Sequence, residues 1–280
     1  MQANGPYLQT WIQSTQAWRD IVSPEAESQI MDWPCQDDFH TKQGRSTGRF
    51  VLGRKPLPIY LKRHWQFPWW LKKRVQLFPS VPITPAAVEW HNLRWASGAG
   101  FLVPEPLAMG QLIGPNNTLH CFLAIRELTG QLALHQAIPQ ARETLSASDF
   151  AVWKEALLVQ TASIAGQLHQ RHRFHKDLYL CHYYVNAPQA GHTEPGPVSL
   201  IDFHRLAEHR TFAWRWKVKD LAQLLFSTWG VAGLEDADRS LLLKAYGCDS
   251  WLSQAVWFKA RRYAHHNHTA TTSASGREAA

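Results

Sequence analysis

Short apolar runs dominate the first half of the chain, and apolar positions at helical spacing dominate the second. The runs at 50–52 and 59–61 are separated by turn residues, which predicts a hairpin of two strands. The run HCFLAIR, residues 120–126, predicts another strand. Residues 149–169 carry apolar side chains three and four positions apart, which predicts a long helix with one buried face.

Further elements follow from local start signals and spacing. Thr84-Pro85 combines a capping hydroxyl with a proline at the first helical position, which predicts a helix to about residue 96. The remaining predicted elements are a helical face formed by Leu8, Trp11, Ile12 and Trp18, a short strand over 198–202, and helices over 220–229, 236–247 and 250–263.

The order of these elements predicts the architecture. A strand-rich segment with one helix precedes a helix-rich segment, which indicates an α+β protein with a small antiparallel sheet lobe and a larger helical lobe. The expected divisions are an N-terminal extension over 1–35, a sheet lobe over 36–126, a helical lobe over 127–264 and a disordered tail over 265–280.

Composition narrows the class of protein and of partner. Of 280 residues, 45% are hydrophobic and 18% charged, which excludes a largely disordered chain. Lys and Arg number 29 against 22 Asp and Glu, so the net charge of +7 favours an anionic partner. The absence of a long apolar run, of a secretory pattern and of closely spaced cysteine pairs favours a cytoplasmic setting.

Two aspartates carry the strongest chemical signal. Asp177 lies in HKDLYLCH, just after the long predicted helix, and Asp202 ends the short strand in LIDFH. In phosphoryl transfer one carboxylate orients the acceptor hydroxyl and another holds magnesium against the nucleotide phosphates. Taken singly, each aspartate is better explained as a turn or cap residue, which is the usual role of a lone aspartate. Their order and spacing approximate the paired catalytic and metal-binding motifs of kinases.

Other residues extend this hypothesis. Lys62 ends an apolar strand and can place its ammonium over nucleotide phosphates, and Glu89 in the next helix can pair with it. The structural alternatives are a solvated strand-end lysine and an exposed helix carboxylate. Gly44 and Gly48 can form a phosphate-covering turn, although the full glycine-rich signature is absent. His182 stands where kinases have an asparagine, and imidazole is a softer ligand than magnesium prefers.

The segment 63–78 alternates aromatic residues with cations. Trp69, Trp70 and Leu71 are followed by Lys72, Lys73 and Arg74. Such a segment can insert rings at a lipid headgroup boundary while its cations meet anionic lipid. It can equally stack bases of a nucleic acid, or be a helix that packs on the sheet lobe and leaves a basic face in solvent.

The motifs around the aspartates resemble a known family. The stretch HKDLYLCH, the stretch LIDFHR, and WRWKVKDLA at residues 214–222 are similar to the lipopolysaccharide core heptose kinases, the WaaP or InaA-type lipopolysaccharide kinase family. YLKRH around Lys62 and VEW around Glu89 continue the likeness, which covers roughly residues 40–263. Members of this family also carry a histidine at the position of His182.

The resemblance implies a protein-kinase-like fold and an ATP- and Mg-dependent sugar kinase. By position, Asp177 would be the catalytic aspartate, Asp202 the metal ligand, Lys62 the phosphate lysine, Glu89 its partner and Asp220 a structural brace for the catalytic loop. The expected substrate is a heptose of the lipid-linked core oligosaccharide. The protein would act as a peripheral protein on the cytoplasmic, anionic face of the inner membrane, without nucleic acid.

Two other classes of function remain open at this point. A protein of the same fold can be a soluble small-molecule phosphotransferase or a protein kinase. A basic, aromatic-rich chain can also be a non-catalytic protein that binds membrane or nucleic acid. The aspartate pair argues against the non-catalytic class, and the segment 63–78 favours a membrane-borne substrate over a soluble one.

Overall fold

The computed structural model describes residues 7, 9–34, 44–78, 81, 83–114 and 118–275, and the side chains of these residues except 9, 10 and 266–275. The chain divides into two compact units, Met1–Thr129 and Gly130–Ala280, called here the N-terminal and C-terminal units. No helix in the described part of the chain is long and apolar enough to cross a bilayer.

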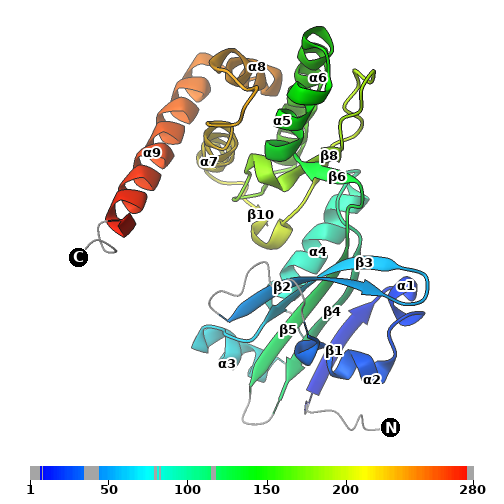
Figure 1. Cartoon of the computed structure of the whole chain (residues 1–280). Coiled ribbons are helices and arrows are strands. Elements are labelled where there is room, and N and C mark those ends of the chain that lie inside the picture. The colour runs from blue at the N-terminus through cyan, green and yellow to red at the C-terminus, as the bar shows by residue number, and fades with distance from the viewer. Residues whose placement is uncertain are drawn as a thin grey trace. The chain divides into compact units, whose positions relative to one another are not determined.

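The N-terminal unit is built on a five-stranded antiparallel sheet in the order β1-β4-β5-β3-β2 (Figure 1). Helix α4 packs against β4 and β5, and its Pro85 stands at the first turn, as the sequence predicted. The elements of this unit are β1 (Gln9–Ser14), α1 (Gln16–Arg19), α2 (Pro24–Ser28), η1 (Ile30–Asp32), β2 (Arg45–Leu52), β3 (Leu57–His64), α3 (Trp69–Leu77), α4 (Pro85–Gly98), β4 (Pro106–Ile113) and β5 (Leu119–Arg126).

Strand β3 shows how the two faces of this sheet are assigned. Successive side chains of a strand point to opposite faces. Leu57, Ile59 and Leu61 are buried in a cluster with Trp18 and Ile30. Lys62 therefore lies on the opposite face of β3 from these residues.

The described residues of the segment 1–35 belong to this unit, although the sequence set that segment apart as an extension. Leu8 lies outside the described residues. Strand β1 pairs with β4, and Trp18, Val22 and Ile30 are buried in the core beneath the sheet. The helical face predicted from Leu8, Trp11, Ile12 and Trp18 is wrong for Trp11 and Ile12, which lie in β1. Apolar residues three to four positions apart fit a strand followed by one helical turn as well as a continuous helix.

The C-terminal unit is mainly helical (Figure 1). Its short strands form two small sheets, β6-β8-β9 and β7-β10. The elements are β6 (Gln131–Ala133), α5 (Leu134–Thr144), α6 (Ala147–Gln170), β7 (Arg173–Phe174), η3 (Leu180–His182), β8 (Tyr183–Asn186), β9 (Ser199–Leu200), η4 (Phe203–Arg205), β10 (Ala207–Glu208), α7 (Ala213–Phe226), α8 (Asp236–Tyr246) and α9 (Ser250–Ser275).

The last helix differs from the prediction. Helix α9 continues to Ser275, past residue 264, where the sequence indicated that a disordered tail begins. The sequence between residues 264 and 275 contains alanines and no glycine or proline, so no helix-breaking residue occurs before Gly276. Residues 276–280 lie outside the described part of the chain.

Candidate active site

In the N-terminal unit the predicted ion pair between Lys62 and Glu89 is present. Lys62 Nζ lies 2.7 Å from Glu89 Oε1, and the glutamate side chain is 4% exposed. The pair forms because Lys62 lies on the face of β3 opposite the Trp18 cluster, while Glu89 lies one turn into α4. A carboxylate this deeply buried needs a cationic partner, so the pair fixes the position of the ammonium.

Gly44 and Gly48 do not form a common turn. Gly48 lies inside β2 opposite Leu61. The Gly44 carbonyl accepts hydrogen bonds from the backbone N–H groups of Trp65 and Gln66, and its φ of +73° together with the nearby Gln66 side chain requires a glycine. Both glycines thus have structural roles in the β2–β3 pair, which leaves the predicted phosphate-covering turn without support from their geometry.

The prediction that the basic segment 63–78 begins with an exposed cation is wrong for Arg63. Its side chain is buried, and the guanidinium donates hydrogen bonds to Ser46 Oγ and to the carbonyls of Met31 and Trp33. The alternation along β3 places Arg63 on the same face as Leu61, beneath the N-terminal segment. Its charge is therefore not available to a membrane.

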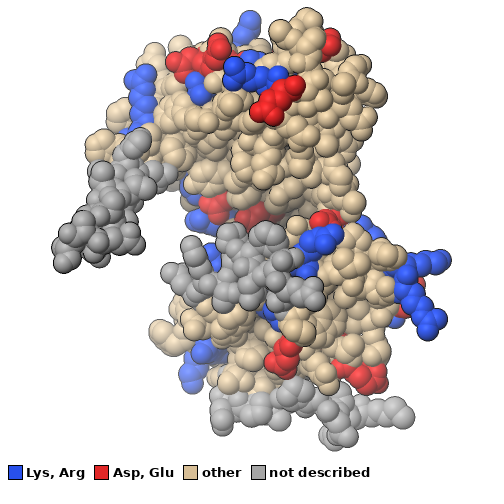
Figure 2. All heavy atoms as spheres, in the orientation of Figure 1, with Lys and Arg blue, Asp and Glu red and all other residues tan. Residues whose placement is uncertain are grey.

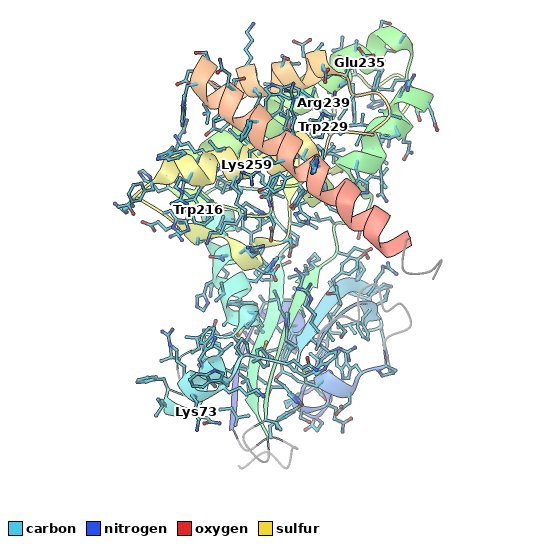
Figure 3. All side chains as sticks on the ribbon, turned by 90° about the vertical axis from the view of Figure 1, so that its left-hand side faces the viewer. Lys73, Trp216, Trp229, Glu235, Arg239 and Lys259 are labelled. Atoms are coloured by element: carbon cyan, nitrogen blue, oxygen red, sulfur yellow. The ribbon has the colours of Figure 1, made fainter. Side chains whose placement is uncertain are left out.

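Helix α3 is partly packed and partly exposed. Leu71 and Val75 are buried against Ile113 and Leu119 at the end of the β4–β5 pair. Trp69 is 76% exposed and Trp70 53% exposed, and Lys73 lies on the same helix (Figure 3). One face of the helix thus packs on the sheet, as the packing alternative predicted, and the other face is exposed, as a lipid-binding segment requires.

In the C-terminal unit the loop that carries Asp177 is held by helix α7. The buried Asp220 carboxylate accepts hydrogen bonds of 2.8 Å from the backbone N–H groups of both His175 and Lys176. Gln223 accepts from the Leu178 N–H, and Ser227 Oγ accepts from the Leu180 N–H. The bracing role predicted for Asp220 is confirmed. Gln223 and Ser227 were missed, although their spacing of three and seven residues from Asp220 indicates one helix face.

His175 fixes the other side of this loop. Its ring is fully buried, and Nε2–H donates to the Ile201 carbonyl at 3.0 Å, directly before Asp202. Burial lowers the pKa of His175, so the neutral imidazole is the favoured form. The neutral ring therefore ties the Asp177 loop to the strand that ends at Asp202.

Asp202 is placed by strand pairing and by an unusual backbone conformation. Tyr183 pairs with Leu200 in the β8–β9 ladder, and the Ile201 N–H donates to the His182 carbonyl. Asp202 itself has a φ of +67°, which asparagine and aspartate tolerate better than other residues with a side chain. A left-handed residue of this kind is often found at functional sites.

His204 lies between the two aspartates. Its Nδ1 is 2.8 Å from Asp202 Oδ1, and its Nε2 is 3.8 Å from Asp177 Oδ2. Arg205 donates from Nη1 to both oxygens of Asp177, at 3.0 and 3.1 Å. Neither residue was given a role from the sequence, although they lie only two and three residues after Asp202. The structure therefore brings Asp177 and Asp202 into one polar cluster.

The donor set around Asp202 fits a cation. His182 Nδ1–H donates to the Asp177 carbonyl at 2.7 Å, so in the neutral ring Nε2 carries a lone pair, 3.7 Å from Asp202 Oδ2. The lone pair and the carboxylate oxygen repel each other, and a proton or a metal ion between them relieves this repulsion. Burial alone lowers the pKa of His182, but Cys181, the Asp202 carboxylate and the Asp177 carbonyl outweigh it and raise the pKa. The Asp202 carboxylate is a suitable magnesium ligand, and the imidazole a less typical one.

Few protein ligands for a metal ion lie around Asp202 in the described part of the chain. The described residues contain no group of three or more His, Cys, Asp or Glu side chains that could hold a metal ion by themselves. Magnesium in phosphoryl-transfer enzymes is commonly held by one or two carboxylates together with substrate phosphates. Asp202 is a carboxylate of the kind that such sites use.

Comparison with known proteins places the chain among its relatives. The sequence model of the lipopolysaccharide kinase (Kdo/WaaP) family matches residues 35–246. The lipopolysaccharide core heptose(I) kinase WaaP of Pseudomonas aeruginosa is 27% identical over 208 residues, which cover 74% of this chain and 75% of that protein. WaaP of Escherichia coli K12 is 28% identical over 210 residues, covering 74% and 76%.

A solved structure supports the same assignment of fold. The structure of WaaP in complex with acyl carrier protein has a TM-score of 0.64 and 21% identity, and the match covers 94% of this chain and 98% of that one. The predicted α+β, protein-kinase-like fold is confirmed. An acyl carrier protein was not among the partners expected from the sequence. The family match covers well over half of the sequence, and the chain belongs to the lipopolysaccharide kinase (Kdo/WaaP) family.

Proposed function

We propose that the protein is an ATP- and Mg-dependent kinase that phosphorylates a heptose of the lipopolysaccharide inner core. The observation that carries this proposal is the joint placement of Asp177 and Asp202, linked by His204. The relatives are named as kinases of the same class of sugar. Asp202 would hold magnesium, which would neutralise the charge that develops on the transferred group.

Each site residue has a defined task in this proposal. Asp177 accepts the proton of the acceptor hydroxyl, and Asp202 holds the metal. The Lys62 ammonium, kept in place by Glu89, contacts the nucleotide phosphates. The raised pKa of His182 favours the protonated ring, which can donate a hydrogen bond from Nε2 to the nucleotide phosphates. Asp220 acts at a distance, by holding the backbone on which Asp177 stands.

Asp202→Asn tests the proposal directly. Asparagine tolerates the left-handed backbone at this position but removes the negative charge, so we expect MgATP binding to fall while the fold is kept. Calorimetry measures MgATP binding, and transfer is followed from γ-labelled ATP to core lipopolysaccharide of a deletion strain. The control is Asp236→Asn, a carboxylate that is 83% exposed on α8. Undiminished MgATP affinity in Asp202→Asn would show that the metal is held elsewhere.

We further propose that helix α3 docks the protein on anionic lipid at the cytoplasmic face of the inner membrane. The support is the exposure of Trp69 and Trp70 beside Lys73 and Arg74. On the face shown in Figure 2, Lys and Arg side chains are interspersed with Asp and Glu side chains. That face therefore lends no support to a continuous track for nucleic acid.

Removal of two of these charges should weaken lipid binding. Each Lys or Arg near an anionic surface contributes about 1 kcal/mol, so Lys73→Gln/Arg74→Gln should lower the vesicle partition coefficient roughly thirtyfold at low salt. Co-sedimentation with vesicles containing phosphatidylglycerol measures it. The matched control is Arg54→Gln/Lys55→Gln, two exposed cations in the β2–β3 turn. Equal decreases of the partition coefficient in both variants would indicate that only the net charge of the protein matters. An unchanged partition coefficient in both would indicate that α3 only packs on the sheet.

A further inference from the structure

Three cations gather beside the Asp177 carboxylate. Arg205 binds Asp177 directly, Lys176 precedes it, and Lys219 from α7 donates from Nζ to the Lys176 carbonyl. The Lys176 ammonium lies 4.7 Å from the ring centroid of Trp216, and the Lys219 ammonium lies 5.9 Å from the same centroid. Trp216, labelled in Figure 3, lies in α7 and stacks on His209 at 4.4 Å.

The carboxylates nearby do not neutralise this cluster. Asp177 is already paired with Arg205. Asp220 is fully buried and uses its two oxygens for the backbone N–H groups of the loop and for His169. Three positive charges thus lie beside the Asp177 carboxylate, with the neutral rings of Tyr179, Trp216 and His209 around them. Burial first, and then the charge of Arg205, lowers the pKa of both Lys176 and Lys219.

Some N–H donors of this cluster have no hydrogen-bond acceptor among the described residues. The Arg205 guanidinium donates through Nη1, and within the part of the chain that the structure describes its Nε and Nη2 have no hydrogen-bond partner. The Lys176 ammonium has the Trp216 ring as a neighbour and, among the described residues, no hydrogen-bond acceptor. A guanidinium fork and an ammonium of this kind match the oxygens of a phosphate or a carboxylate.

We propose that Lys176, Arg205 and Lys219 form a binding site for an anionic group, a carboxylate or a phosphate, on the acceptor sugar chain. The inference rests on the proposed function, because Asp177 must lie next to the acceptor hydroxyl in a kinase. Any group bound to the free nitrogens of Arg205 then lies within one guanidinium width of that carboxylate. The site positions an acidic acceptor and disfavours a neutral one. The reason is that binding of an anion neutralises the excess positive charge, whereas binding of a neutral group does not.

A titration with inorganic phosphate tests the site without any assumption about the reaction. The full chain is titrated at constant ionic strength without nucleotide, and the shift of the melting temperature gives an apparent Kd. We expect saturable binding that Lys176→Gln weakens about tenfold and Lys176→Arg largely restores. Lys176 is the position of choice because its ammonium carries no hydrogen bond of the loop. Lys244→Gln, an exposed lysine of α8, should bind phosphate as the parent does. Unchanged binding by Lys176→Gln, or no saturable binding by the parent, overturns the proposal.

A transfer assay separates the acceptor from the nucleotide as the source of the anion. De-acylated core oligosaccharide is compared with the same material after carboxyl reduction and dephosphorylation. The parent should show about a tenfold higher KM for the neutralised acceptor, whereas Lys176→Gln should show nearly the same KM for both. A rise in the KM for ATP instead would assign the cluster to the nucleotide and overturn the proposal. Absence of transfer to either acceptor by the parent would refute the proposed function, while the phosphate titration would still decide on the site.

Discussion

Asp177→Asn should abolish most of the phosphate transfer and leave MgATP binding intact. Positioned general-base catalysis contributes typically about 10²–10⁴-fold, and the amide cannot accept the proton of the acceptor hydroxyl. The loop should keep its place, because its backbone is held by Asp220, Gln223 and Ser227 rather than by the Asp177 side chain. The expected result is a fall in kcat of at least a hundredfold with a normal MgATP Kd.

Single-turnover transfer from labelled ATP and calorimetry of MgATP binding measure the two quantities separately. Asp236→Asn again serves as the control, since its carboxylate is 83% exposed and pairs with Arg239, away from the loop. A fall in kcat of less than tenfold would place the base elsewhere. A parallel loss of MgATP binding would indicate that Asp177 contacts the nucleotide rather than the acceptor.

The parts of the fold that could be predicted are those with one unambiguous period or a strong local signal. The β2–β3 hairpin, helix α4 after Thr84-Pro85 and helix α6 follow from turn residues, a capping hydroxyl and helical spacing. Strand β4 was missed, since all its residues from Pro106 to Ile113 are buried and show no alternation. A strand that is buried on both faces shows no alternating pattern in the sequence, so periodicity alone does not distinguish it from a buried helical segment.

The site shows the same division between local and long-range information. Lys62, Glu89 and Asp220 could be named because each stands in a recognisable local pattern, and the structure places Lys62 against Glu89 and Asp220 beneath the loop. Arg205 was missed because its role depends on a contact with Asp177, 28 residues away. Arg63 was misassigned as a surface cation, although the alternation of Leu57, Ile59 and Leu61 already places it on the buried face.

Asp220→Ala should strongly destabilise the C-terminal unit and displace the loop that carries Asp177. It leaves the buried His175 N–H and the part-buried Lys176 N–H without their acceptor. An unsatisfied buried group costs about 1–3 kcal/mol, so the loss at His175 alone is a sizeable part of the stability of a typical domain, and the loss at Lys176 adds to it. We expect a lower melting temperature, faster hydrogen exchange at these two amides, and a loss of transfer through displacement of Asp177.

A graded series separates this role from a general loss of packing. Asp220→Asn keeps one acceptor oxygen and should lie between the parent and Asp220→Ala. Ser227→Ala removes the acceptor for the Leu180 N–H and the hydroxyl that donates to the Leu224 carbonyl, and should cost less than either. Hydrogen exchange of the individual amides gives the readout, because His175 and Lys176 should lose protection in the Asp220 variants and Leu180 in Ser227→Ala. If the His175 and Lys176 amides stay protected in Asp220→Ala, the loop is held by other contacts, and the link from α7 through the loop to Asp177 fails.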